Sequence, residues 1–384
     1  MTVTIISRDQ LEELRPPPTP EISYSGSLSL RRKNHQRPKP KSRTKPLASG
    51  STTETSSREG SNGKSTPLTD QTSPEMRPQA DLPIRPVRDG KGSAPLIDIG
   101  ANLTKPYFRD EDMVNVLRRA SKAGLTHIVI IGANLTRSKQ ALEVCQKFDG
   151  KQGITLRCTI GIHPNDAHST LFRKAKEPGV FVERALAKTY ASELERLITS
   201  EAGQKYCVAV GECGLDYCRA KEHALYQKQV FRKQLALAEK TGLPLFLHSR
   251  DSHADFFSIL KPYLGRVKAV VHCHTDPSIK NLKELLDAGC YIGLTGIICD
   301  ERKGRFNKEI VKHIPLDRLM VETDAPFLLP RNALGGHQDR RRNNEPCLLP
   351  FVVREIAKLQ DCGPKKIAHK TTEAAKQFFG LGDR

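Results

Sequence analysis

The chain has 384 residues, which allows one large domain or two of ordinary size, and 62 Lys and Arg against 43 Asp and Glu give a formal charge of +19. No stretch approaches the roughly 18 consecutive apolar residues of a membrane helix, and the N-terminus carries acidic residues where a signal peptide carries basic ones. These features argue against membrane spanning and secretion, and the positive charge favours a polyanionic partner such as nucleic acid.

The first 94 residues differ in composition from the rest of the chain. They hold 12 of the 25 prolines and 14 serines, and their large apolar residues are scattered, so burial cannot offset the entropy cost of ordering them. We expect residues 1–94 to be a disordered extension. Within it, residues 31–46 carry eight basic residues and no acidic one, which fits a nuclear-import signal, a phosphate-binding arm or a solvated tail. The ten cysteines all lie beyond it without a CxxC pair, which is typical of reduced thiols in an intracellular protein of the nucleus, the cytoplasm or both.

From Leu96 onward, short apolar runs rich in β-branched residues alternate with longer amphipathic stretches, a pattern typical of βα units and a parallel sheet. The runs are residues 96–101, 127–133, 155–163, 207–214, 244–249, 268–273, 290–296 and 319–326. Eight runs within residues 95–384 match the strand count of an α/β fold of the (β/α)8 TIM-barrel type, which typically takes about 250 residues. We therefore predict one barrel domain over residues 95–384, with a doubly wound open sheet as the alternative.

Amphipathic stretches between these runs supply the helices. Residues 109–124 begin with acidic side chains and end at a glycine, and residues 223–242 end at a glycine followed shortly by Pro244. Similar patterns follow Ser138, Asp251 and Ser278, and the longest gap between runs holds a helix pattern at residues 190–203.

Polar residues with metal-ligand chemistry stand at the ends of the predicted strands. They are His163, Glu212, His248, His272, His274 and Asp324. Because the carboxyl ends of barrel strands meet at one mouth, we expect these side chains to converge there. A strand-end histidine alone is more often hydrogen-bonded locally, but histidines and carboxylates from four strand ends together favour a mixed N/O site for Zn²⁺, Mn²⁺ or Mg²⁺.

Asp324 lies closer to the predicted mouth than Glu322, which shares its face of the strand. We expect Asp324 to hold the cation and to accept a proton from the attacking water. A divalent cation lowers the pKa of a bound water toward 7, which prepares that water for attack on phosphorus or on a carbonyl carbon. A helix N-cap is the alternative role for Asp324.

The motifs GECGLDY, LHSR, VHCHTD, GIHPN and ETDAP together resemble those of the TatD family of metal-dependent deoxyribonucleases, in the amidohydrolase-like superfamily. The resemblance runs from about Leu96 to Gly380 and implies a (β/α)8 nuclease that hydrolyses DNA phosphodiester bonds with one or two divalent cations, commonly from the 3′ end. It implies that Glu212, His248, His272 and Asp324 hold metal, that Glu212 and Asp324 are catalytic, and that His163 contacts a substrate phosphate.

Two positions depart from the family pattern. Many members carry a pair of histidines on the first strand, where this chain resembles the TatD-proper subgroup with Gly100 and Asn102. Asn102 offers only a neutral oxygen, so we expect a weak, water-rich first site that favours Mg²⁺ over Mn²⁺ or Zn²⁺. His274 stands where the family usually has an aromatic residue, and we expect a polar rim residue there, with an extra metal ligand or phosphate donor as the alternative.

Basic residues near the predicted mouth suit the charge of a phosphodiester. Arg250 follows His248 closely, and the loop after the last strand carries Arg331, Arg340, Arg341 and Arg342. Solvated surface positions are the alternative for the loop arginines.

An aromatic and three cysteines also lie beside the candidate ligands. Tyr217 is placed to stack on a base or to pack against the core. Cys213 and Cys273 directly follow Glu212 and His272, so we expect them to point away from the site as small buried hydrophobes. Cys218 is less constrained and keeps metal contact as a minor alternative.

The sequence thus predicts an intracellular metal-dependent deoxyribonuclease that acts as a 3′-5′ exonuclease through a water activated by the cation. DNA is the expected partner, and no membrane or obligate protein partner is inferred. An amidohydrolase or small phosphoester hydrolase using the same metal site is the alternative, because fold does not decide between these chemistries. A non-catalytic nucleic-acid-binding scaffold is the third hypothesis.

Overall fold

The structure, a computed structural model, describes residues 84–88, 90, 92–174, 181–301, 306–334 and 343–382. Nearly all of the predicted extension, including residues 31–46, lies outside the described residues. The same holds for Arg340, Arg341 and Arg342.

Eight parallel strands form one sheet and follow one another around it in chain order. They are β1 (Leu96–Ala101), β2 (Leu125–Ile130), β3 (Thr155–Ile160), β6 (Cys207–Asp216), β7 (Leu245–Arg250), β8 (Ala269–Val271), β9 (Tyr291–Leu294) and β10 (Leu319–Val321). The ends of β1 and β10 meet, because Asp324 N donates to Gly100 O at 2.8 Å and Asn102 N donates to Ala325 O at 2.7 Å. The predicted (β/α)8 barrel is therefore confirmed over the open sheet, and each predicted run coincides with one of the eight strands.

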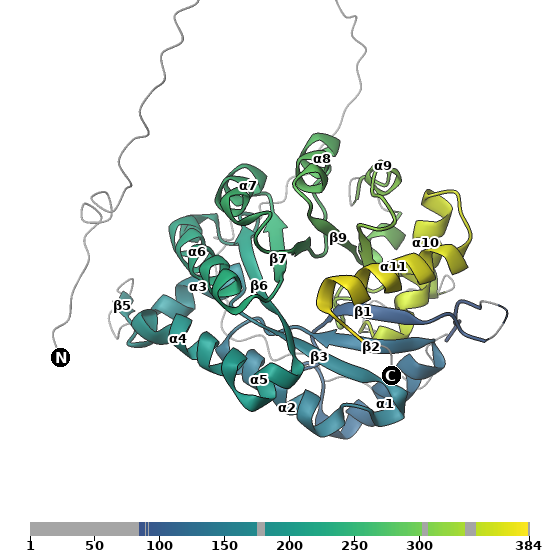
Figure 1. Cartoon of the computed structure of the whole chain (residues 1–384), viewed down its shortest axis with the longest axis horizontal. Helices are drawn as coiled ribbons and strands as arrows, with labels where there is room; N and C mark the ends of the chain where they lie inside the picture. The colour runs from purple at the N-terminus through teal and green to yellow at the C-terminus, as the bar shows by residue number, and fades with distance from the viewer. Residues whose placement is uncertain are drawn as a thin grey trace, which may run out of the picture. The chain divides into compact units, whose positions relative to one another are not determined.

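Helices surround the strands on the outside (Figure 1). They are α1 (Asp110–Lys122), α2 (Leu135–Phe148), α3 (Pro164–Leu171), α4 (Leu186–Thr199), α5 (Glu201–Tyr206), α6 (Ala224–Thr241), α7 (His253–Leu260), α8 (Ile279–Asp287), α9 (Glu309–Lys312), α10 (Leu349–Leu359) and α11 (Pro364–Phe379). The predicted acidic start of α1 is present in its first turn, where negative charge complements the helix dipole. α6 ends at Gly242, whose φ of 71° lies in the left-handed region that favours glycine.

The segment between β3 and β6 differs from the prediction in two ways. A short antiparallel hairpin, β4 (Phe172–Lys174) and β5 (Phe181–Glu183), follows α3. Strands of three residues carry too little periodicity for a sequence pattern to reveal them. The predicted helix at 190–203 is two helices, since the Ser200 side chain accepts a hydrogen bond from Gly203 N and caps the start of α5.

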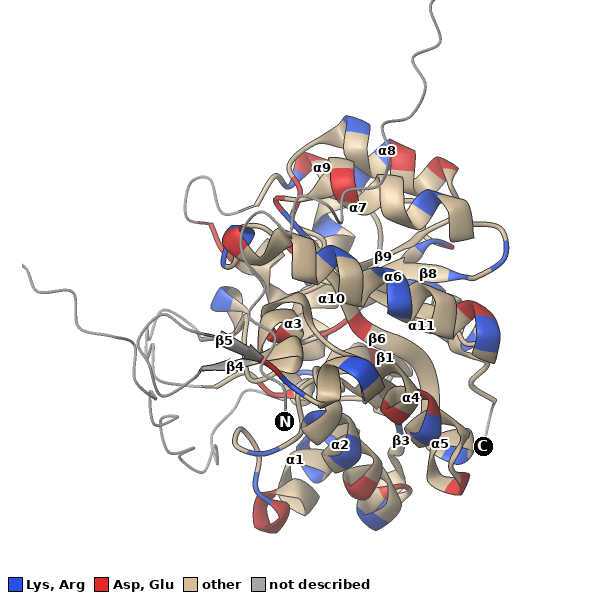
Figure 2. Cartoon of the chain, turned by 90° about the vertical axis from the view of Figure 1, so that its left-hand side faces the viewer, with Lys and Arg blue, Asp and Glu red and all other residues tan. Residues whose placement is uncertain are grey.

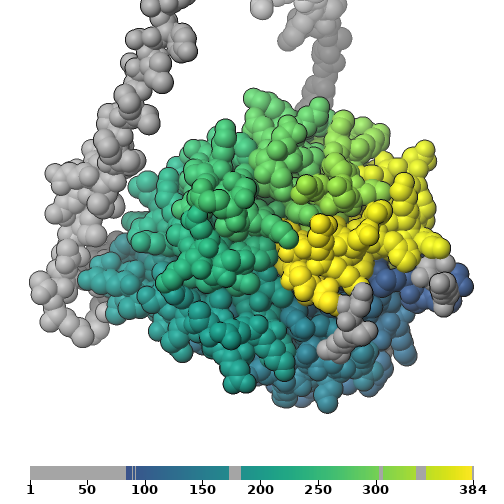
Figure 3. Space-filling model, in the orientation of Figure 1, coloured from purple at the N-terminus to yellow at the C-terminus, as the bar shows by residue number. Residues whose placement is uncertain are grey.

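Both ends of the described chain pack against the barrel. Val87 is 3% exposed and Ala94 N donates to Val87 O at 2.7 Å, so packed structure begins before the predicted boundary at residue 95. Arg354 of α10 donates to the carbonyl oxygens of Arg85 and Pro86. Helix α11 packs against β1, and in Figure 3 the C-terminal residues lie beside those of the first strand.

Lys and Arg are interspersed with Asp and Glu along the outer helices that Figure 2 shows. Among the described residues, no helix combines the length and the apolar character needed to cross a bilayer.

Candidate active site

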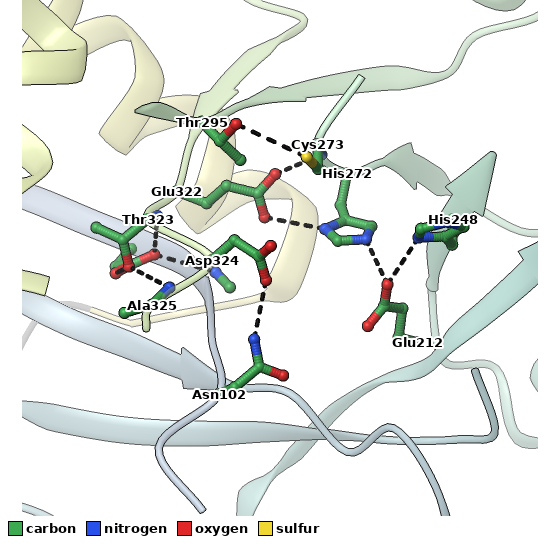
Figure 4. A network of polar contacts seen from close by, with 12 residues as sticks. Asn102, Glu212, His248, His272, Cys273, Thr295, Glu322, Thr323, Asp324 and Ala325 are labelled. Atoms are coloured by element: carbon green, nitrogen blue, oxygen red, sulfur yellow. Dashed lines mark hydrogen bonds and ion pairs between the residues drawn. The ribbon is translucent and has the colours of Figure 1, made fainter. Parts of the chain in front are cut away.

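Glu212 of β6 is the centre of the site. Its Oε1 lies 2.6 Å from His272 Nε2, 2.9 Å from His248 Nδ1 and 3.3 Å from His163 Nε2. The histidines belong to β7 and to the residues that follow β3 and β8, so the barrel brings four separate strands together here, partly visible in Figure 4. The side chain of Glu212 is 7% exposed and those of the three histidines between 3% and 17%. The predicted convergence is thus present for Glu212 and these three histidines.

The buried carboxylates and imidazoles of this cluster offset the effect of burial on one another's pKa values. Burial raises the pKa of Glu212, but His163 and His272 outweigh it and hold that pKa well below its usual range. Burial lowers the pKa of His272, and the carboxylates of Glu212 and Glu322 reverse this and raise it well above the ordinary value. The charged forms therefore stabilise one another in a region that water reaches poorly.

Asp324, which follows β10, adds a second carboxyl group to the site. Its Oδ1 accepts a hydrogen bond from Asn102 Nδ2 at 2.9 Å, and its backbone φ of 52° is in the left-handed region. Figure 4 shows the carboxyl group facing the region that His272 and Glu212 also face. Burial, with nearby Glu212 and Glu322 adding to it and His272 opposing it, raises the pKa of Asp324 to about 8. The side chain thus binds Asn102, and it does not cap a helix.

Glu322, which follows β10, is a candidate site residue whose role was not predicted from the sequence. It is fully buried, its Oε2 lies 3.4 Å from His272 Nδ1, and its Oε1 accepts the hydrogen bond from Cys273 N. It therefore fixes the orientation of His272, as outer carboxylates commonly do for metal-binding histidines. Gly100 makes room for it, because a Cβ there would lie 2.5 Å from Glu322 Oε2.

Asp98 and Asp216 are two further carboxylates that were not predicted from the sequence. Asp98 is fully buried, accepts hydrogen bonds from Thr323 N at 2.9 Å and Gly100 N at 3.2 Å, and has a pKa raised to about 7 by burial. It holds the residue next to Asp324. Asp216 Oδ2 lies 3.4 Å from His248 Nε2. An acidic residue inside an apolar run, as in LIDIGA, and the last acid of GECGLD were the available sequence signals.

His274 differs from its predicted position at the rim. It is 2% exposed, and burial lowers its pKa to about 4 despite the opposing charge of Asp276. The imidazole of His274 is therefore buried and uncharged near neutral pH. The interactions that the structure gives it do not join it to the Glu212 cluster.

The remaining candidates lie around the site rather than in it. Arg250 ends β7 and its charge helps to lower the pKa of Asp216, whereas Arg331 begins a 3₁₀ turn after β10. The Tyr217 hydroxyl donates to Asp255 at 2.8 Å, and its partly buried ring packs against the core. Cys213 is buried as predicted, Cys273 is partly exposed with Sγ 3.7 Å from Thr295 Oγ1, and Cys218 is exposed.

The donor set fits a divalent cation. One ligand atom each from His163, Glu212 and His248 lie within 4.8 Å of one another, which is the spacing of atoms that share one ion. Imidazole nitrogens with carboxylate oxygens form the mixed environment that Zn²⁺, Mn²⁺ and Mg²⁺ accept to different degrees. His272 and Asp324 stand beside this trio and have the chemistry to complete or extend it.

A (β/α)8 barrel with buried carboxylates and imidazoles at the carboxyl ends of its strands belongs to the class of metal-dependent barrel hydrolases. Residues 97–380 match the family described as TatD related DNase. The chain is therefore a member of this family, and the resemblance seen in its motifs is confirmed, as is the predicted class of hydrolase.

Curated relatives agree with this membership. The chain is 40% identical over 287 residues to the 3′-5′ ssDNA/RNA exonuclease TatD of Edwardsiella piscicida, covering 74% of this chain and 100% of that protein. It is 37% identical over 290 residues to the protein of the same name from Dickeya dadantii, covering 75% and 99%.

Solved structures show the same fold. A TatD family hydrolase of Entamoeba histolytica superimposes with a TM-score of 0.61 at 28% identity, covering 74% of this chain and 97% of that one. A TatD homologue of Escherichia coli K12 gives a TM-score of 0.62 at 24% identity, covering 75% and 98%.

Proposed function

We propose that this protein is a metal-dependent exonuclease that removes nucleotides from the 3′ end of single-stranded DNA by hydrolysis of phosphodiester bonds. The observation that supports it most is the Glu212 carboxylate oxygen shared by three imidazoles, beside the Asn102–Asp324 pair, at the barrel mouth. Family membership and the names of the curated relatives support the substrate.

The residues divide between binding a cation and handling the proton. Glu212, His163, His248, His272 and Asp324 are the proposed ligands, and Mg²⁺ is the proposed cation, with Mn²⁺ or Zn²⁺ as substitutes. A bound cation polarises a phosphate oxygen and lowers the pKa of a coordinated water. Asp324 has one oxygen bound to Asn102, so its other oxygen suits a general base for the attacking water.

We propose that basic residues at the mouth bind the phosphates of DNA. Arg250 lies beside Asp216 at the end of β7, and Arg331 follows the β10 loop. Guanidinium groups at such positions suit the oxygens of successive phosphates. Arg340, Arg341 and Arg342 are proposed for the same role.

End-labelled single-stranded DNA tests the proposal. The purified chain is incubated with Mg²⁺, Mn²⁺, Zn²⁺ or EDTA, next to the variants Glu212→Gln and Asp324→Asn. Glu239→Gln is the matched control, since this exposed carboxylate pairs with Arg266 outside the site. We expect metal-dependent shortening from the 3′ end that both site variants lose and the control keeps. DNA left intact by a chain that still binds the cation would contradict the proposal and favour a smaller ester or amide substrate.

We propose further that the N-terminal extension is separate from catalysis and that residues 31–46 direct entry into the nucleus. Because residues 84–88 pack on the barrel, the test truncation starts at residue 84 and not at 95. The truncated chain should degrade DNA as the full chain does. A fluorescent fusion that lacks residues 31–46 should lose nuclear accumulation, and an unchanged distribution would refute that role.

A further inference from the structure

Phe327 is an exposed aromatic ring beside the proposed catalytic carboxylate. Within the described residues, only Leu225 and Phe327 are large hydrophobic side chains with high exposure, and Phe327 is 44% exposed. Phe327 N donates to Asp324 O at 2.9 Å, so the ring belongs to the same turn as Asp324. A single exposed apolar ring is ordinary on a protein surface, so it is the position of this ring beside Asp324 that makes it a candidate contact for substrate.

Tyr107 supports this ring from a neighbouring loop. The two rings meet edge to face, with centroids 5.2 Å apart and planes at 78°. Tyr107 lies five residues after Asn102, whose side chain binds Asp324. The two loops that carry the rings are therefore the two loops joined at the site.

Arg137 extends the pair with a positive charge. Its Nη2 donates to the Tyr107 hydroxyl at 3.0 Å, and its guanidinium carbon lies 4.9 Å from the Tyr107 ring centroid. In the described part of the chain, no carboxylate forms an ion pair with this guanidinium. Its remaining donors are thus available to an anion.

A cleft of about 360 Å³ adjoins Arg137. Its lining includes the basic residues Lys105, Arg137 and Arg184 and one acid, Asp166, which already accepts a hydrogen bond from Asn134. The volume lies in the range of small-ligand sites, and the lining has a positive balance. Such a cleft suits one phosphate-bearing unit of a chain.

We propose that Phe327, Tyr107 and Arg137, here called the rim row, bind the end of a single strand. Phe327 stacks on the base of the terminal nucleotide, Tyr107 holds the Phe327 ring, and Arg137 with the adjoining cleft binds a neighbouring phosphate. Stacking on an aromatic ring tolerates every base, because every base has a π-face. The rim row thus binds the end of a strand without regard to sequence, and this inference rests on the proposed exonuclease function.

A double-mutant cycle tests the contact between Phe327 and the terminal base, because it removes the ring, the base or both. Steady-state kcat and KM are measured on single-stranded DNA with an ordinary 3′-terminal nucleotide and with an abasic one, for wild type, Phe327→Ala and Phe327→Trp. Loss of one stack should raise KM about 10-fold for Phe327→Ala, and Trp should restore it. The abasic end should raise the KM of wild type by a similar factor and that of Phe327→Ala by none. Leu225→Ala, the other exposed hydrophobe, is the control and should match wild type.

Two results would overturn the inference. One is an unchanged KM in Phe327→Ala. The other is additive loss from the ring and the base, since a ring that only positions the Asp324 turn would act equally on both substrates. Failure of the proposed function is separate, because wild type would then leave DNA uncut. The inference would in that case be decided by the affinity for single-stranded DNA in EDTA, which Phe327→Ala must weaken several-fold.

Discussion

Gly100→Ala tests how the site depends on space inside the barrel. The added Cβ would lie 2.5 Å from Glu322 Oε2, 3.0 Å from Phe246 Cζ and 3.2 Å from Ile131 Cδ1. Real Cβ atoms do not tolerate the first of these distances, so Glu322 must move. Its displacement removes the contact with His272 Nδ1 and the hydrogen bond from Cys273 N.

The cost follows from these contacts. Overpacking a well-filled core costs ~1–3 kcal/mol, and a buried polar group left without its partner costs a further ~1–3 kcal/mol. We therefore expect a loss of ~2–5 kcal/mol in the free energy of unfolding. Cation affinity should also fall by about 10- to 100-fold, the usual effect of losing a group that orients a metal-binding histidine.

The assays are urea unfolding and calorimetric titration with Mn²⁺. Gly363→Ala is the matched control, because a Cβ at Gly363 has no neighbour within 4 Å. Glu322→Asp, which is one methylene shorter, should partly restore stability when combined with Gly100→Ala. If the free energy of unfolding of Gly100→Ala lies within about 0.5 kcal/mol of wild type, the reasoning is refuted, because surface substitutions alone change stability by that much. Strictly additive losses in the double variant would refute it as well.

Two further predictions concern stability. The pKa of Asp98 is raised from 3.8 to about 7, so the native state binds the extra proton. The stability from this group is therefore complete below pH 3.8 and is lost as the pH rises toward 7. The stability of wild type relative to Asp98→Asn should fall by ~1.4 kcal/mol per pH unit between pH 5 and 7 in urea titrations, and a flat difference would contradict this. Arg119 donates to both oxygens of Glu345, at 2.7 and 2.9 Å, and the Glu345 side chain is 4% exposed. Arg119→Ala should lower the free energy of unfolding by ~3–5 kcal/mol, because it leaves a buried carboxylate unpaired. The double variant Arg119→Ala with Glu345→Gln should lose less than the sum of the losses of the two single variants. Additive thermal shifts would count against that explanation.

The strands and the convergence of Glu212 with His248 were predictable because each depends on a local pattern. An apolar run marks a barrel strand, and the residue at its carboxyl end must face the mouth, so Glu212 and His248 followed from position alone. Glu322 has the same strand-end signal as Asp324, yet only packing across the barrel shows that it holds His272. The prediction of a rim position for His274 was wrong, because this side chain is buried. Burial depends on neighbouring residues from other parts of the chain, which a strand pattern does not reveal.

Loop conformation was the other feature that could not be predicted from the sequence. The exposure of Phe327 depends on the turn after Asp324, and the contact with Tyr107 joins residues more than two hundred positions apart. No periodic pattern encodes such a contact. Ser200 likewise divides one predicted helix into two because its hydroxyl competes for a backbone donor.

Gly100 and Asn102 stand on the first strand where many family members carry paired histidines, and both positions contact proposed site residues of other strands. Gly100 provides the volume that Glu322 occupies, and Glu322 orients His272. Asn102 donates to Asp324 and orients that carboxyl group. Each of the two positions therefore fixes a ligand from another strand, where a histidine would supply a ligand itself. An imidazole at position 100 would need the space of Glu322, so the two arrangements exclude each other in this barrel. In this chain β1 thus positions the proposed cation-binding groups of other strands.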